Sequence, residues 1–164
     1  MDEQRKYEYT GETKVVSGKT LRRIRALRDV GRWTKTGDVG GWIESDANLA
    51  HEGECWVAGD ARVAGNARVF GDAWVGEQAH ISGHARVGGL ANVGHHARIY
   101  GSAIVLGRTI VDGYSHIYGD AQVGGNSGVG GDARGATWIG FRSRVHGKAR
   151  VPQGAHVRGI EIVE

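Results

Sequence analysis

An aliphatic residue recurs at every sixth position through the middle of the chain. From Val57 to Val129 this residue is always valine or isoleucine, thirteen times in succession. The fourth residue after each aliphatic one is alanine, threonine or serine. The second residue after each aliphatic one is glycine, except at Glu77 and His95. A fixed internal period of this kind is the signature of a solenoid, in which each repeat stacks on its neighbours.

Each repeat predicts a short strand followed by a corner. Ala61 and Val63 are two residues apart, so both side chains point to the same side of a strand, while Arg62 points outward. The preceding residues 58–60, Ala-Gly-Asp, turn a corner, where glycine accepts a positive φ. Three such units close a triangular coil of 18 residues, and about seven coils stack at the strand spacing of about 4.8 Å. The sequence therefore predicts an all-β chain that folds as a parallel β-helix.

The repeats resemble those of a known superfamily. The hexapeptides VAGDAR, VAGNAR, ISGHAR and IYGDAQ are similar to the aliphatic-x-x-x-small-x motif of the hexapeptide-repeat proteins. This resemblance covers residues 43–163 and implies a left-handed coil, an exception to the usual right-handed crossover. A second segment, GDVGGWIESDANLAHEGECWV, resembles β-helical proteins of phages, prophages and enteric bacteria that are labelled transferases because of the same repeat. The second resemblance implies a phage or bacterial context.

The period is interrupted in two places. Eight residues separate Leu49 from Val57, which predicts two extra residues near His51. Residues 135–138 form a four-residue insertion, after which the aliphatic positions resume and run to Val163.

Residues 1–40 lack the repeat, and we expect them to cap the β-helix of residues 41–164, because an uncovered end would expose strand edges. They alternate in a way that suggests strands joined by turns at GETK or SGK. An amphipathic helix over Leu21–Arg28 is the alternative.

Residues one coil apart should form columns down the outside of the β-helix. The first column is basic, and two tyrosines should lie beside it. The expected binding residues are Arg62, His80, Arg98, His116, Arg134, Tyr100 and Tyr118. Like charges one strand apart repel each other, and an anionic partner would relieve this repulsion. The alternative is that the arginines only cover and solubilise the strands.

The other two faces carry apolar side chains that could form a subunit interface. Phe70, Ile104 and Leu106 should gather on the second face, and Trp56 and Trp74 on the third. Exposed apolar patches often mark interfaces, and hexapeptide-repeat proteins are typically trimers. We therefore expect a homo-oligomer, either a dimer or a trimer.

Two enzyme classes follow from the superfamily resemblance. An acyltransferase would use an acyl-CoA donor and a histidine base, with His95 or His96 as candidates, but the protruding loop and C-terminal helix common in that class are missing from the pattern. A zinc site like that of γ-class carbonic anhydrases is disfavoured, because His80 and His116 would lie roughly 9.6 Å apart and Ala121 stands where a third histidine would be needed. We expect neither a cofactor nor a metal.

Composition narrows the remaining functions. The hydrophobic content of 40% argues against disorder despite 29 glycines. There is no apolar run of membrane-spanning length and no signal peptide at the start, and Cys55 occupies a core position. We therefore expect a non-catalytic, cytoplasmic binding protein, encoded by a phage or prophage. Its partner would be a host protein or a ribonucleoprotein or other nucleic-acid complex, and it could inhibit a host or defence factor.

Overall fold

A computed structural model describes residues 5–131, 136–140, 142, 144–148, 150–151, 153–159 and 161–163. These residues form three longer strands at the N-terminus, a short 3-10 helix and many strands of two or three residues. The N-terminal elements are β1 (Tyr7–Val16), β2 (Lys19–Ala26), β3 (Val39–Ile43) and η1 (Asp46–Asn48). The short strands are β4 (Trp56–Val57), β5 (Arg62–Val63), β6 (Arg68–Val69), β7 (Trp74–Val75), β8 (His80–Ile81), β9 (Arg86–Val87), β10 (Asn92–Val93), β11 (Arg98–Ile99), β12 (Ile104–Val105), β13 (Ile110–Val111), β14 (His116–Ile117), β15 (Gln122–Val123), β16 (Gly128–Val129), β17 (Trp138–Gly140), β18 (Arg144–His146), β19 (Arg150–Val151), β20 (His156–Arg158) and β21 (Glu161–Val163).

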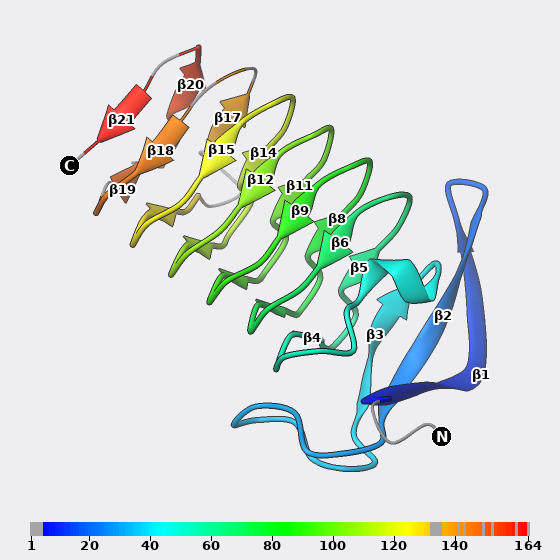
Figure 1. Cartoon of the computed structure of the whole chain (residues 1–164). Coiled ribbons are helices and arrows are strands. Elements are labelled where there is room, and N and C mark those ends of the chain that lie inside the picture. The colour runs from blue at the N-terminus through cyan, green and yellow to red at the C-terminus, as the bar shows by residue number, and fades with distance from the viewer. Residues whose placement is uncertain are drawn as a thin grey trace.

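The short strands stack into three parallel sheets that form the walls of a solenoid (Figure 1). The first face contains β5, β8, β11, β14, β17 and β20, the second contains β6, β9, β12, β15, β18 and β21, and the third contains β4, β7, β10, β13, β16 and β19. The predicted all-β parallel β-helix is therefore confirmed. In the part of the chain that the structure describes, these short strands number six on each face, so the β-helix has about six turns, where about seven were expected.

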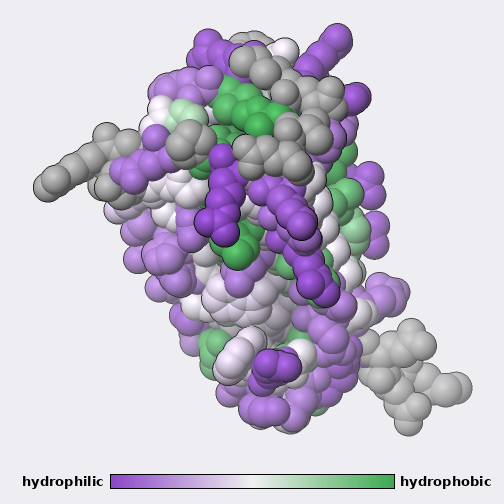
Figure 2. All heavy atoms as spheres, turned by 90° about the vertical axis from the view of Figure 1, so that its left-hand side faces the viewer, coloured by the Kyte–Doolittle hydropathy of each residue, from purple (hydrophilic) through white to green (hydrophobic). Residues whose placement is uncertain are grey.

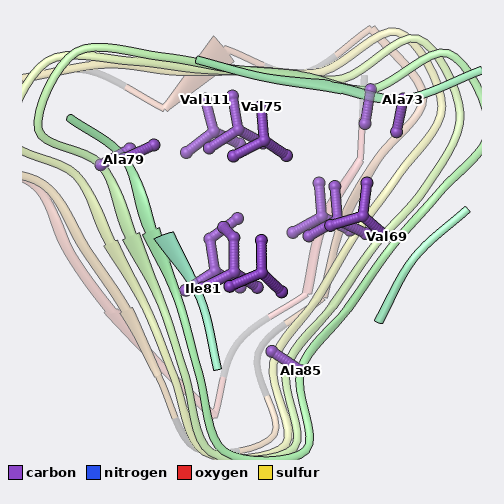
Figure 3. Close-up of a cluster of buried hydrophobic side chains, with 14 of the residues drawn as sticks. Val69, Ala73, Val75, Ala79, Ile81, Ala85 and Val111 are labelled. Carbon is purple, nitrogen blue, oxygen red and sulfur yellow. The ribbon is translucent and has the colours of Figure 1, made fainter. Parts of the chain in front are cut away.

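The core runs through the middle of the triangular coils (Figure 3). Val69, Val75 and Ile81 point inward from three different walls, and Ala73 and Ala79 lie nearer the corners; all five are fully buried. Burying one such aliphatic side chain contributes about 1.5–3 kcal/mol. Repetition of the same inward positions in every coil makes the core one continuous column.

The corners require a left-handed backbone. At Gly113 the φ angle is 64°, and an added Cβ would stand 1.7 Å from the carbonyl oxygen of Gly131. Glu77 and His95, the two positions where the repeat lacks glycine, adopt the same conformation with φ angles of 57° and 53°. Side chains there are strained, because a Cβ crowds the neighbouring carbonyl in this region.

The two predicted irregularities are confirmed by the strand register. A regular 18-residue coil would pair Leu49 with position 67. Leu49 instead bridges Val69, so the first coil contains a two-residue bulge. Ile117 pairs with Ile139 rather than with the position four places earlier, so the later coil contains the four-residue insertion.

The expected core position at Val163 is wrong by one residue. Val145 pairs with Ile162 instead of Val163, so the last coil is one residue short, and Ile162 packs against the core. Positions 162 and 163 both carry an aliphatic side chain, so the sequence pattern does not reveal that the coil is one residue shorter.

The N-terminal segment is a β-hairpin that continues the first face. Strands β1 and β2 are antiparallel, and the turn between them has positive φ at both Ser17 and Gly18, as in tight two-residue hairpins. Strand β2 pairs with β3, and β3 pairs in parallel with β5. The alternative helix over Leu21–Arg28 is therefore wrong. Tyr7 and Ile24 are fully buried in the same cluster as the coil residues, so the hairpin covers this end of the core.

The outer surface is mixed in character. Viewed from the side where β19, β20 and β21 lie, hydrophilic residues surround small hydrophobic patches (Figure 2). Among the described residues, no helix has the length and apolar character needed to cross a membrane.

Candidate anion-binding face

The first face places the predicted basic residues in one column. Arg62 pairs in register with His80, His80 with Arg98, and Arg98 with His116. We call these four residues the basic column. Their order follows from the regular coil, because every outward position of one strand lies next to the same position in the following coil.

The residue that follows His116 in the column is Trp138. The four-residue insertion brings Trp138 next to His116, so the expected place of Arg134 belongs to Trp138. The rings of His116 and Trp138 stack with their centroids 3.9 Å apart. Arg134 itself lies outside the described residues.

A hollow of about 350 Å³ lies along the basic column. We call it the cationic cleft, and its lining residues are Arg62, Gln78, His80, His96, Arg98, Tyr114 and His116. Every one of these side chains can donate a hydrogen bond, and none of these described lining residues carries a carboxylate. The cleft is therefore suited to a ligand that offers oxygen acceptors and negative charge.

Three of the lining residues were not among the expected binding residues, although His96 was a candidate base for the acyltransferase alternative. Gln78, His96 and Tyr114 lie at the corner that precedes the first face, and His96 stacks on Tyr114 with ring centroids 4.6 Å apart. Each of the three lies one coil after the last, and this regular spacing was a usable signal. The direction of a corner side chain, however, does not follow from strand alternation.

The two arginines of the basic column have no acidic partner within the part of the chain that the structure describes. The cations of the ion pairs there belong to the N-terminal segment, as in Arg25 with Glu8 and Lys19 with Glu44, except for one pair between His95 and Glu77. The nearest acidic position in the adjoining corner is Asp60, which accepts a hydrogen bond from the Trp42 indole instead. Arg62 and Arg98 thus keep their charge available for a ligand.

The histidines of the column are poor cations in the unbound protein. Burial lowers the pKa of His80, and the positive charges of Arg62 and Arg98 lower it further. Burial and Arg98 likewise lower the pKa of His116. The expected repulsion among a full row of cations is therefore smaller than a count of basic residues suggests, since neutral histidines separate the arginines.

His116 also has a polar atom without a partner. Its Nδ1 is buried and makes no hydrogen bond among the described residues. A buried N–H left without an acceptor is costly, which favours the neutral tautomer that carries its proton on Nε2. This tautomer makes His116 a hydrogen-bond donor through Nε2.

The two predicted tyrosines lie beside the column but do not line the cleft. The rings of Tyr100 and Tyr118 stack with centroids 5.4 Å apart. The other side of the Tyr118 ring covers Gly140, where an added Cβ would stand 2.2 Å from the ring. Both faces of Tyr118 are therefore covered, which leaves little room for a nucleobase to stack on it.

The hairpin adds one more cation to this face. Lys14 Nζ lies 4.0 Å from the centroid of the Trp42 ring, and Trp42 pairs in register with Arg62. Burial lowers the pKa of Lys14, and the nearby charge of Arg62 lowers it further. The positive face thus extends from the coils onto the N-terminal hairpin.

The apolar candidates for a subunit interface fall into two groups. Phe70 and Ile104 on the second face are partly exposed, and Leu106 is exposed. On the third face Trp74 is partly exposed, but Trp56 is only 2% exposed and packs in the core cluster. The expectation that Trp56 is available to another subunit is therefore wrong in the folded chain.

The third face carries a larger hollow beside these tryptophans. It has a volume of about 660 Å³ and lies between the 30–34 loop and the coils, with Trp33, Trp56, Trp74, Glu54 and Asp72 in its lining. Glu54 is held in place by Arg28 and by the backbone N–H of Gly31. The lining mixes apolar rings with charges of both signs and lacks the uniform donor character of the cationic cleft.

Cys55 is buried, as expected for a core position. It has an unexpected neighbour, since Nζ of the fully buried Lys6 lies 2.9 Å from its sulfur. No cluster of three or more histidine, cysteine or acidic side chains that could hold a metal occurs among the described residues.

No protein-family model matches this chain, and a search of curated proteins finds no match.

Proposed function

We propose that this protein is a non-catalytic binding protein whose first face holds an anionic surface of a protein partner. The observation that carries the proposal is the cationic cleft, in which Arg62 and Arg98 lie without an acidic partner among the described residues. A rigid solenoid fixes the spacing of these donors before the partner arrives, which reduces the entropy lost on binding.

A protein partner is favoured over a nucleic acid by the aromatic side chains. Proteins that bind single strands stack bases on open aromatic rings. Here Tyr118 is covered by Tyr100 on one side and by Gly140 on the other. The phage resemblance of the GGWIE and GECWV segments supports a host protein as the partner, and inhibition of a host or defence factor would be the consequence of its capture.

Affinity capture from bacterial lysate tests this proposal with a matched pair of variants. Arg62→Glu/Arg98→Glu removes the positive charge of the cleft. Arg68→Glu/Arg86→Glu makes the same change in net charge on the second face, where both arginines are exposed and occupy the same position in the repeat.

We expect the wild type and the second-face variant to capture the same partner, and the first-face variant to lose it. Equal capture by both variants would contradict the proposal, and so would capture that disappears after nuclease treatment. Saturable binding of acetyl-CoA would instead favour the acyltransferase alternative.

A further inference from the structure

The arginines of the cationic cleft are arranged around a histidine. Arg62, His80 and Arg98 are consecutive in the column, so the two arginine backbones are about 9.6 Å apart, twice the strand spacing. Gln78 and His96 line the cleft from the neighbouring corner. Flexible arginine side chains can therefore converge on one group placed above His80.

The number of donors exceeds what a carboxylate can use. A carboxylate offers two oxygens and one negative charge, whereas a phosphate ester offers three acceptor oxygens and a charge of about −1.5 to −2. Two guanidinium groups match that charge, and each can bind phosphate oxygens in a bidentate manner. Gln78 and the histidine N–H groups can donate to oxygens that the arginines leave free.

We infer that the cationic cleft binds a phosphomonoester group. This inference rests on the proposed function, because it assigns the phosphate to a side chain of the protein partner. The hollow of about 350 Å³ accommodates the phosphoryl group together with part of the side chain that carries it.

Proton uptake should accompany binding. In the unbound protein, burial and the charges of Arg62 and Arg98 hold the pKa of His80 below its usual value. The dianion reverses this electrostatic effect and favours the charged imidazole. His80 lines the cationic cleft and a neighbouring hollow against the hairpin, and the other charged or titratable groups in these two linings are Arg62, Arg98, His96, Tyr114, His116, Lys19 and His84. Neither lining contains a carboxylate among the described residues, so the bound dianion supplies the negative charge beside His80.

Titration of the full chain with O-phospho-L-serine tests the inference, with L-glutamate and AMP as comparison ligands. Imidazole nitrogen signals from long-range ¹H–¹⁵N NMR report which histidines respond. Calorimetry in buffers of different ionisation enthalpy measures the protons taken up. The variants are Arg62→Gln/Arg98→Gln and the matched Arg68→Gln/Arg86→Gln.

We expect O-phospho-L-serine to saturate the site, to shift the His80 signals and to bind more tightly at pH 6.5 than at pH 8. Its affinity should fall by about tenfold or more in the first-face variant and stay unchanged in the second-face variant. Equal binding of L-glutamate, or equal loss in both variants, overturns the inference. Tighter binding of AMP overturns the assignment of the phosphate to a protein side chain.

The two proposals can fail separately. Partner capture that depends on Arg62 and Arg98 but survives phosphatase treatment of the lysate supports the proposed function and overturns the phosphate inference. Specific O-phospho-L-serine binding without any captured protein supports the cleft assignment and contradicts the proposed function.

Discussion

Arginine and histidine alternate along the basic column, and this order controls the electrostatics of the first face. His80 lies between Arg62 and Arg98, and its lowered pKa means that a neutral ring separates the two charges. The second face shows the other arrangement, in which Arg68 and Arg86 are direct neighbours. Those two arginines are exposed to solvent, which screens their repulsion. Arg62, His80 and His116 are partly buried, so solvent screens the first column less and the alternation matters more there.

The lowered histidine pKa values predict a loss of stability in mild acid. The folded-state pKa of His80 and of His116 lies below that of the unfolded chain, so the unfolded state takes up protons first as the pH falls. Stability therefore declines as the pH drops below about 6.5. We expect the melting temperature to be lower at pH 5 than at pH 7.5, and His80→Gln to reduce that difference. An identical pH dependence in the variant would contradict this assignment.

Strain at a corner predicts a stabilising substitution. Glu77 has a φ angle of 57° where other repeats have glycine, and its exposed ion pair with His95 contributes little. Glu77→Gly should raise stability by about 0.5 kcal/mol, because relief of the left-handed strain exceeds the added chain entropy of glycine. Urea denaturation measures the change. Glu77→Ala is the control, and an equal gain from alanine would rule out backbone strain as the cause.

At the level of elements, the sequence predicted the strands whose positions follow from the repeat. It left open the elements whose structure depends on pairing with other strands. The six-residue repeat identified the short strands and the positions of both insertions. The segment around Leu21 and Ile24 fits an amphipathic helix equally well by spacing, and only its pairing with β1 and β3 makes it a strand. The last coil is one residue short, and the adjacent aliphatic residues Ile162 and Val163 conceal this from a periodicity analysis.

The hairpin should unfold together with the coils. Ile24 is fully buried in the shared core cluster, so Ile24→Ala should cost about 2–5 kcal/mol within a single unfolding transition. Val15→Ala is the control in the same hairpin, because Val15 is 72% exposed; surface substitutions of this kind usually change stability by less than about 0.5 kcal/mol. Two separate transitions, or equal effects of the two variants, would show that the hairpin does not share the core.

At the scale of the whole molecule, the solenoid presents three faces of different chemistry. The first is basic, the second carries the partly exposed Phe70 and Ile104 with the exposed Leu106, and the third holds the hollow beside Trp33. The sequence predicted the membership of each outward column as far as the four-residue insertion, since this follows from the regular coil; after the insertion Trp138 takes the place expected for Arg134. It did not predict the corner residues of the cationic cleft or the burial of Trp56, because both depend on loop conformation.

The second face leads to a prediction about assembly. We expect a dimer or trimer of the 17.5 kDa chain, held through Leu106 and its neighbours, and we expect Leu106→Glu to convert it to a monomer. Light scattering coupled to size-exclusion chromatography measures the mass. Trp74→Glu on the third face is the comparison variant. A wild-type monomer, or an assembly that survives the Leu106 change, would rule out this interface.

The strict alternation of inward and outward side chains has a consequence for how such a chain can evolve. The inward valine, isoleucine and alanine residues maintain the fold, while Arg62, His80 and their column neighbours contribute little to the core. Substitutions in an outward column can therefore accumulate without unfolding the protein. A lineage under pressure from a changing partner could exchange one recognition surface for another while every coil remained in place.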